Sequence, residues 1–117
     1  MTAFRLFLAA LGLTILLYTL PVIANHGMDL LPIFFGDIAK MDWPGQFNVD
    51  FSTFLLMTML WVAWRNGFSV PGLLLACLVP VGGGMFTSGY VLFLSFQLRG
   101  DMAAVLLGSK RAAALRR

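Results

Sequence analysis

Charged side chains are scarce in this chain, which has 117 residues and only 11% of them charged. Soluble domains have about 25% charged residues, so the composition argues against a soluble globular fold. Glutamate does not occur, and the single cysteine, Cys77, excludes an internal disulfide. The net charge is only +3, so we predict no nucleic-acid partner. Anionic lipid headgroups account more simply for a short basic tail.

Two long stretches, residues 6–28 and 68–98, contain no Asp, Glu, Lys or Arg. A helix needs about 20 apolar residues to cross the ~30 Å hydrocarbon core of a bilayer, and both stretches exceed that length. A third apolar run becomes long enough when it is extended back to Phe47. We therefore predict an all-α integral membrane protein that forms one domain over residues 1–117. Its three transmembrane helices are expected at residues 4–24, 47–64 and 70–98.

The connection between the first two spans is predicted to contain a short helix in the membrane interface, at residues 29–41. Its apolar residues fall on roughly one helical face, as is typical of interfacial helices, whereas Asp37 and Lys40 lie off that face. Residues 43–45 (Trp-Pro-Gly) are expected to form the turn that follows. Beyond the third span we expect a short C-terminal helix and a basic tail, within residues 99–117.

Small residues recur every four positions through the third predicted span. On one helix they form a ridge along which another helix can approach closely. The ridge consists of Gly72, Ala76, Pro80, Gly84 and Ser88. Three successive glycines, at residues 82–84, also lie in this span. A turn at these glycines would give four spans, two of them with only about 14 residues, so we predict a single third span.

The distribution of bases gives conflicting evidence on orientation, because Lys and Arg favour the cytoplasmic side. With three spans, a cytoplasmic N-terminus places Arg5 and Arg65 inside and leaves Lys40 and the five tail bases outside. The reverse orientation agrees better with that count. The first span, however, is similar to a secretion signal and favours a cytoplasmic N-terminus. We predict a multi-pass protein of the inner (cytoplasmic) membrane with its N-terminus in the cytoplasm.

Few polar residues are candidates for a functional site. His26, Asp29 and the other acids of the connection could bind a divalent cation, but an acidic loop in water is the simpler interpretation, and no metal site is predicted. Asp50 is the one acid that could lie within the bilayer boundary, where a carboxylate is a functional candidate. Its alternative role is at the start of the second span, near the positive end of the helix dipole. The only histidine has no Ser or Cys neighbour to activate, so we predict no catalytic residue and no enzyme.

An aromatic stripe follows the glycines, at Phe86, Tyr90 and Phe93. Such residues at helical spacing most often pack against helices or lipid. They could also contact a quinone or a pigment. No cofactor of this chain is predicted, and bound lipid, quinone or pigment would come through a larger complex.

Several short motifs are spread along nearly the whole chain. They are residues 25–30 (Asn-His-Gly-Met-Asp-Leu), the Phe34-Phe35 pair, Asp50, residues 64–67 (Trp-Arg-Asn-Gly), and Leu92-Phe93-Leu94 followed by Leu98-Arg99. Together they resemble an uncharacterised family of small three-span bacterial membrane proteins, a domain of unknown function. The chain departs from that pattern in the single base of its interhelical loop, Arg65, and in its longer basic tail. The resemblance implies a three-helix fold and no biochemical activity.

Two functions of different classes are expected from these features. The first is a non-catalytic accessory or structural subunit of a larger respiratory or photosynthetic membrane complex. Its partners would be membrane lipids and other membrane-protein subunits, because the chain has a packing ridge and is too small to enclose a substrate path. The alternative is a homo-oligomeric passive conduit, or a carrier of lipids or small solutes, with Asp50 facing a wet lumen.

Overall fold

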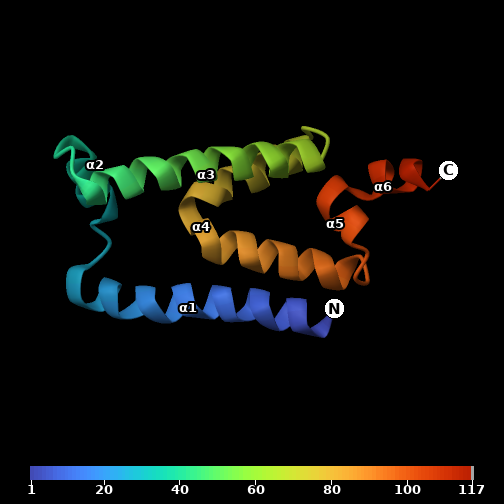
Figure 1. Cartoon of the computed structure of the whole chain (residues 1–117), viewed down its shortest axis with the longest axis horizontal. Helices are drawn as coiled ribbons and strands as arrows, with labels where there is room; N and C mark the ends of the chain where they lie inside the picture. Colours follow the sequence, from blue (N-terminus) through green and yellow to red (C-terminus); the bar gives the residue numbers. More distant parts are fainter. Residues whose placement is uncertain (117) are drawn as a thin grey trace.

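The computed structural model describes residues 1–116, which form α-helices and, within that range, no β-strand (Figure 1). The helices are α1 (Thr2–His26), α2 (Leu30–Ala39), α3 (Trp43–Arg65), α4 (Val70–Gln97), α5 (Met102–Leu107) and α6 (Ser109–Leu115). α1, α3 and α4 are each long and apolar enough to cross a membrane. The predicted all-α fold with three helices of membrane-spanning length is therefore confirmed.

The local sequence explains where the long helices begin. Pro44 and Pro71 lie in the first turns of α3 and α4, where the missing N–H costs no hydrogen bond. The Ser69 side chain caps α4 by accepting a hydrogen bond from the Gly72 amide at 3.2 Å. α3 begins at Trp43, earlier than predicted, so the Trp-Pro-Gly sequence is its first turn and not a separate connection.

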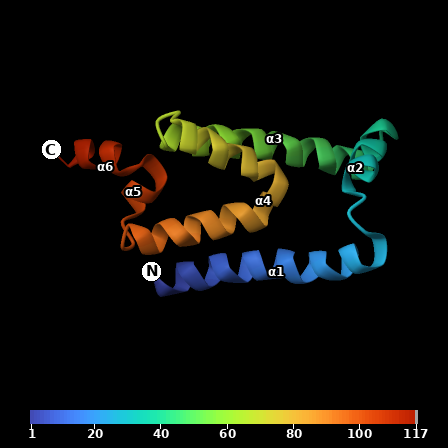
Figure 2. The ribbon, with the colours of Figure 1, turned by 180° about the vertical axis from the view of Figure 1, so that it is seen from behind.

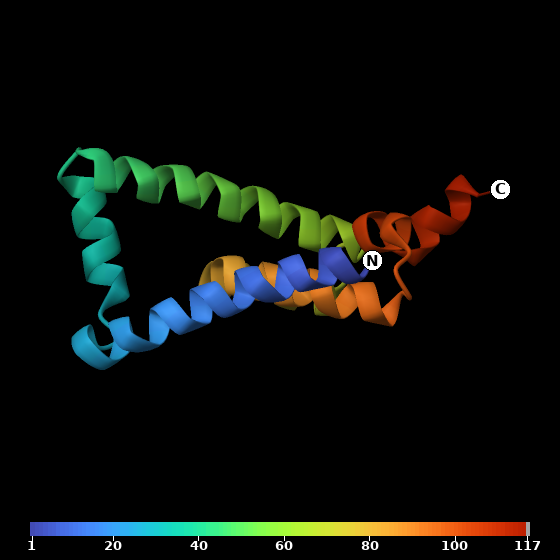
Figure 3. The same cartoon turned by 60° about the horizontal axis from the view of Figure 1, so that its bottom comes forward.

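α2 lies across one end of the molecule, between the end of α1 and the start of α3 (Figure 3). Gly45 lets α3 begin close against α2, because a Cβ at that position would overlap the Asp37 backbone. The Asn48 side chain donates a hydrogen bond to the Phe34 carbonyl at 3.0 Å. The helix expected at residues 29–41 thus forms, shorter at both ends, and it is tied to α3.

α4 does not run straight through the molecule. At Gly83 its backbone takes φ 53° and ψ −129°, and the chain turns back on itself (Figure 1). Beyond this break, the Tyr90 hydroxyl accepts a hydrogen bond from Asn66, just before the start of α4, with 3.0 Å between Nδ2 and Oη. A straight helix would carry Tyr90 about 30 Å beyond Val70, so this contact requires the reversal.

The third helix is therefore a hairpin of two half-length helices, residues 70–82 and 84–97, and not the single membrane crossing expected at residues 70–98. Each half is about 20 Å long, which is short of the ~30 Å hydrocarbon core. α4 starts and ends at the same end of the molecule (Figure 2). The glycine turn considered as an alternative marks the position of the break.

The sequence around Gly83 explains why the helix breaks there. Pro80 has no N–H to donate within the helix, and its ring crowds the preceding turn. Each of the three glycines is about 1 kcal/mol less favourable than alanine inside a helix. Only glycine adopts the backbone angles of Gly83 without strain. A Cβ at this position would also lie 3.3 Å from the ring of Phe51.

The buried core lies in the half of the molecule that contains both ends of α4. Residues 70–82 run along α3, and residues 84–97 run beside α1 (Figures 1 and 2). The main cluster of buried side chains joins α3, both halves of α4, and α5. It consists of Val62, Ala63, Ala76, Val79, Tyr90, Leu94 and Val105. In the other half, α1 and α3 diverge, and α2 bridges them (Figure 3).

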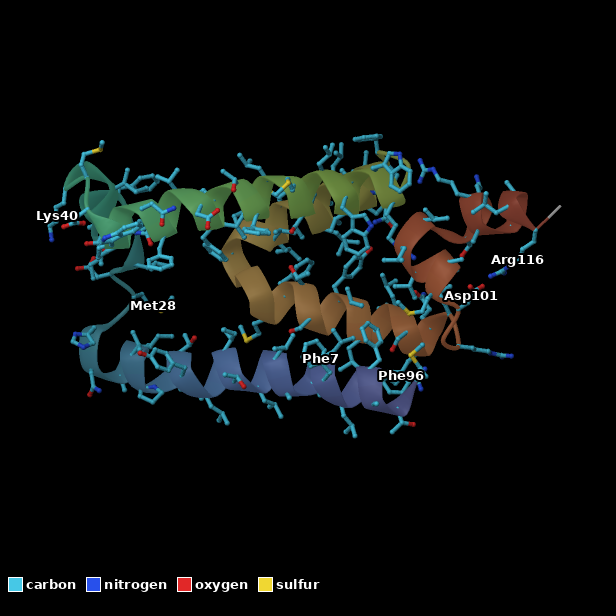
Figure 4. All side chains as sticks on the ribbon, in the orientation of Figure 1. Phe7, Met28, Lys40, Phe96, Asp101 and Arg116 are labelled. Carbon is cyan, nitrogen blue, oxygen red and sulfur yellow. The ribbon has the colours of Figure 1, made fainter. Side chains whose placement is uncertain are left out.

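The reversal of α4 separates the charges of the molecule. One end of the molecule is termed the basic end. It contains the start of α1, the end of α3, and helices α5 and α6. It carries Arg5, Arg65, Arg99, Lys110, Arg111 and Arg116. The opposite end, termed the acidic end, carries Asp29, Asp37, Asp42 and Asp50 with Lys40. Figure 4 shows Asp101 and Arg116 at one end and Lys40 at the other.

We predict that Gly83→Ala destabilises the protein and that Gly89→Ala, in the same helix, does not. Alanine at position 83 must adopt a positive φ, which costs on the order of 1–3 kcal/mol. Gly89 has helical geometry and nothing within 4 Å of an added Cβ, so alanine there should be neutral or stabilise slightly. The free energy of unfolding in mixed detergent micelles measures both effects. Equal values for the two variants would show that the break at Gly83 does not form.

Candidate functional site

At the basic end, side chains from α3 complete the hydrogen bonds of α5. Arg65 donates from Nε to the Val105 carbonyl at 2.5 Å and from Nη2 to the Ala104 carbonyl at 3.1 Å. Trp61 donates from its indole nitrogen to the Leu106 carbonyl at 2.9 Å. The last carbonyls of a helix have no partner within it. α3 therefore supplies the C-terminal cap of α5.

A side chain of α6 also donates a hydrogen bond to a carbonyl at the end of α3. Arg111 donates from Nη1 to the Trp64 carbonyl at 2.7 Å, and its guanidinium carbon lies 4.0 Å from the centre of the Trp64 ring. Gly108 permits this approach, because it has φ 89° and a Cβ there would lie 2.7 Å from the Arg65 carbonyl oxygen. Arg65 of α3 thus bonds the end of α5, Arg111 of α6 bonds the end of α3, and together they hold the C-terminal segment against α3.

A cleft of about 790 Å³ opens between the α3–α4 connection, the end of α4 and the α5–α6 segment. It is termed the basic cleft, because three cationic side chains line it and none of its described lining residues is acidic. Those cations are Arg65, Lys110 and Arg111, and they are joined by Asn66, Ser69 and Gln97. The acid of this end, Asp101, binds Arg116 at 2.5 Å outside the cleft. The hydrogen bond from Arg116 holds the pKa of Asp101 below its usual value.

Tyr90 connects the second half of α4 with the end of α3. Its hydroxyl accepts the Asn66 hydrogen bond, and its ring stacks on Phe86 with centroids 5.7 Å apart. The Trp61 ring meets Tyr90 edge-on at 6.1 Å. Phe93, by contrast, is exposed. The predicted aromatic stripe is thus divided, with two members packed inside the chain and one on its surface.

Arg5 fixes the start of α1 to the end of α4. It donates to the hydroxyl and the carbonyl oxygen of Ser95, at 3.1 and 2.8 Å, and its guanidinium carbon lies 4.0 Å from the centre of the Phe96 ring. Ser95 is fully buried. The sequence offered no signal for this pairing, because Arg5 and Ser95 are far apart along the chain.

The small-residue ridge is divided by the break at Gly83. Gly72 lies against Asn66, and Ala76 belongs to the core beside α3. Beyond the break, Ser88 is buried and its hydroxyl lies 3.0 Å from where a Cβ of Gly12 in α1 would be. An added Cβ at Gly84 would lie 3.9 Å from Ile15 of α1, and Pro80 is exposed. The ridge thus forms two short contacts within the chain, one with the α3 end and one with α1.

The polar residues predicted at the acidic end do not come together. His26, Asp29 and Asp50 are all exposed, and the described residues contain no group of three His, Cys, Asp or Glu side chains that could hold a metal ion. Asp50 instead lines a second cleft, of about 550 Å³, between α2 and α3. Asp42, Gln46 and Thr53 share that lining. They lie with Asp50 on one face of α3, at spacings of three and four residues.

No protein family, curated protein or solved structure matches this chain.

We predict that Arg65→Lys lowers the free energy of unfolding by about 1–3 kcal/mol, because lysine cannot reproduce the fork that bonds two carbonyls of α5. The matched control is Arg99→Lys. The Arg99 side chain is exposed at the same end and makes no hydrogen bond or ion pair with the other described residues. That control should change stability by less than about 0.5 kcal/mol. Equal stability of the Arg65→Lys and natural proteins would contradict the capping role.

Proposed function

We propose that this chain is a non-catalytic accessory subunit of a larger membrane assembly, in which a partner subunit covers the break in α4. The observation that supports this proposal is the exposure of that break. Val81 is 82% exposed, and Pro80 and Gly84 are exposed as well.

A broken helix inside a bilayer needs a partner for its backbone. The carbonyls before the break and the amides after it lose their helical hydrogen bonds. With half-helices of about 20 Å, the tip reaches well into the hydrocarbon core. Each unsatisfied polar group there costs several kcal/mol, so irregular backbone at that depth is buried in protein or lines a water-filled cavity. Pro80, Val81 and Gly84 are exposed, and Gly82 and Gly83 are only half-buried by this chain, so another chain is expected to cover this break.

The long helices also leave most of their apolar surface unpaired. In the most apolar 18-residue segment of α1, only 6% of the segment is buried. The corresponding share in α3 is 11%. The half of α1 that lies toward the acidic end of the molecule has exposed side chains such as Leu17 and Tyr18. Lipid can cover these faces, but the same surface accepts the helices of a partner next to the break.

The charge separation supports a location in the inner membrane with the basic end in the cytoplasm. Because α4 returns to the end where it started, the bases of the N-terminal segment and those of the tail lie together at the basic end. The signal-like first span and the bases of the C-terminal tail then favour the same orientation. Both the start of α1 and the α5–α6 segment are expected on the cytoplasmic side.

The face of α3 that carries Asp42, Gln46, Asp50 and Thr53 favours a second candidate, a homo-oligomeric passive conduit or carrier. In an oligomer, this polar face and the tips of α4 would line a shared, water-filled path. Water would then satisfy the broken backbone, and no foreign subunit would be needed.

Photo-crosslinking from the tip of α4 tests these proposals in the native membrane. A photoreactive residue replaces Val81 in one variant and Val70 in the other. Both are exposed valines of α4, and only Val81 lies at the break. An accessory subunit should crosslink from position 81, but not from position 70, to one different membrane protein. That protein should be present in stoichiometric amount in the native complex, and its deletion should lower the level of this chain.

Crosslinks between copies of this chain alone would contradict the accessory role and favour the conduit. In that case, flux through liposomes should fall in Asp50→Asn and remain in Lys40→Gln, a charge change at the same end. Crosslinks to lipid alone, with a monomeric mass in native mass spectrometry, would contradict both functions.

A further inference from the structure

We infer that the basic cleft binds the phosphate of an anionic phospholipid headgroup. The cleft lies where α3 ends and where α4 starts and ends. For helices that cross or enter a bilayer, this level is the headgroup region, and a phosphate group is the commonest anion there.

The charges around the cleft favour an anion. Arg65, Lys110 and Arg111 line it, and none of its described lining residues is acidic. The acid of this end, Asp101, is already bound to Arg116. The remaining acids lie in or beside α2 and the first half of α3, at the opposite end of the molecule, where Figure 4 shows Lys40. The positive charge of the cleft is therefore not neutralised within the described chain.

The donors that line the cleft are suited to a phosphate oxygen. All hydrogen bonds that Arg111 donates within the described residues come from Nη1, which leaves Nε and Nη2 for a ligand. Its position over the Trp64 ring orients the guanidinium before a ligand arrives. The Lys110 side chain is exposed, and its ammonium group has no hydrogen bond or salt bridge to another described residue. Arg65 directs its donors at α5 and contributes charge.

Two further features distinguish a lipid from a free phosphate ion. Leu98 and Leu107 give the cleft an apolar wall, against which the glycerol and the first acyl carbons of a lipid can pack. Asn66, Ser69 and Gln97 add uncharged polar groups that suit a glycerol or ester oxygen. A small inorganic anion would use neither the apolar wall nor the full width of the cleft.

Native mass spectrometry of the full chain in detergent tests this inference, with phosphatidylglycerol and phosphatidylcholine as probes. We expect phosphatidylglycerol to bind in preference to phosphatidylcholine. Lys110→Gln should weaken the binding of phosphatidylglycerol about fivefold, the size expected for one lysine at an anionic surface. The matched control is Arg99→Gln, which removes an exposed base from the same end but not from the cleft lining. It should leave the binding nearly unchanged.

Three results would overturn the inference. Equal binding of the two lipids would show that the charge of the headgroup is not recognised. Equal weakening by Lys110→Gln and Arg99→Gln would indicate a diffuse attraction to the whole basic end. Displacement of phosphatidylglycerol by millimolar inorganic phosphate would assign the cleft to a free anion. Both substituted side chains are exposed, so we expect both variants to fold. An unfolding transition equal to that of the natural protein checks this.

Discussion

A glycine with φ 53° and ψ −129° cannot continue an α-helix, and in this chain that constraint lies in the middle of the longest apolar segment. Because α4 turns back at Gly83, its second half lies beside α1, and Tyr90 returns to the end of α3. The α5–α6 segment is then placed next to Arg65 and Trp61. The location of the core, the contact between α1 and α4, and the separation of charge between the two ends all depend on this reversal.

The contacts at the basic end maintain the hairpin after it has formed. Arg65 and Trp61 donate to carbonyls in the last turn of α5, and Arg111 donates to the Trp64 carbonyl at the end of α3, which also accepts from the Gly67 amide. Each contact adds a hydrogen bond at the C-terminal end of a helix, where the carbonyls lack the amide of a following turn. The same arrangement gathers cations around the basic cleft. The stability of this end and its proposed affinity for a phosphate thus have a common origin.

The sequence contained enough information for the helical class, because long charge-free runs have few other interpretations. It also indicated α2 and the glycines where α4 breaks. The prediction of a single third span was wrong, because residues 68–98 are long enough for one span and the hydropathy of a segment does not depend on the direction of its backbone. The pairs Arg5–Ser95 and Arg65–Val105 could not be predicted, because they depend on that direction. The ridge of small residues and the aromatic stripe were assigned to one continuous span, and the reversal divides both.

The placement of the two chain ends tests the reversal of α4 most directly. Single cysteines are introduced by Thr2→Cys, Lys110→Cys and Lys40→Cys in a Cys77→Ala background, and sealed vesicles are treated with an impermeant thiol reagent. If α4 is a hairpin, positions 2 and 110 react from the same side of the membrane and position 40 reacts from the other side. If positions 2 and 110 react from opposite sides, α4 crosses the membrane as a straight helix, and the reversal at Gly83 is contradicted.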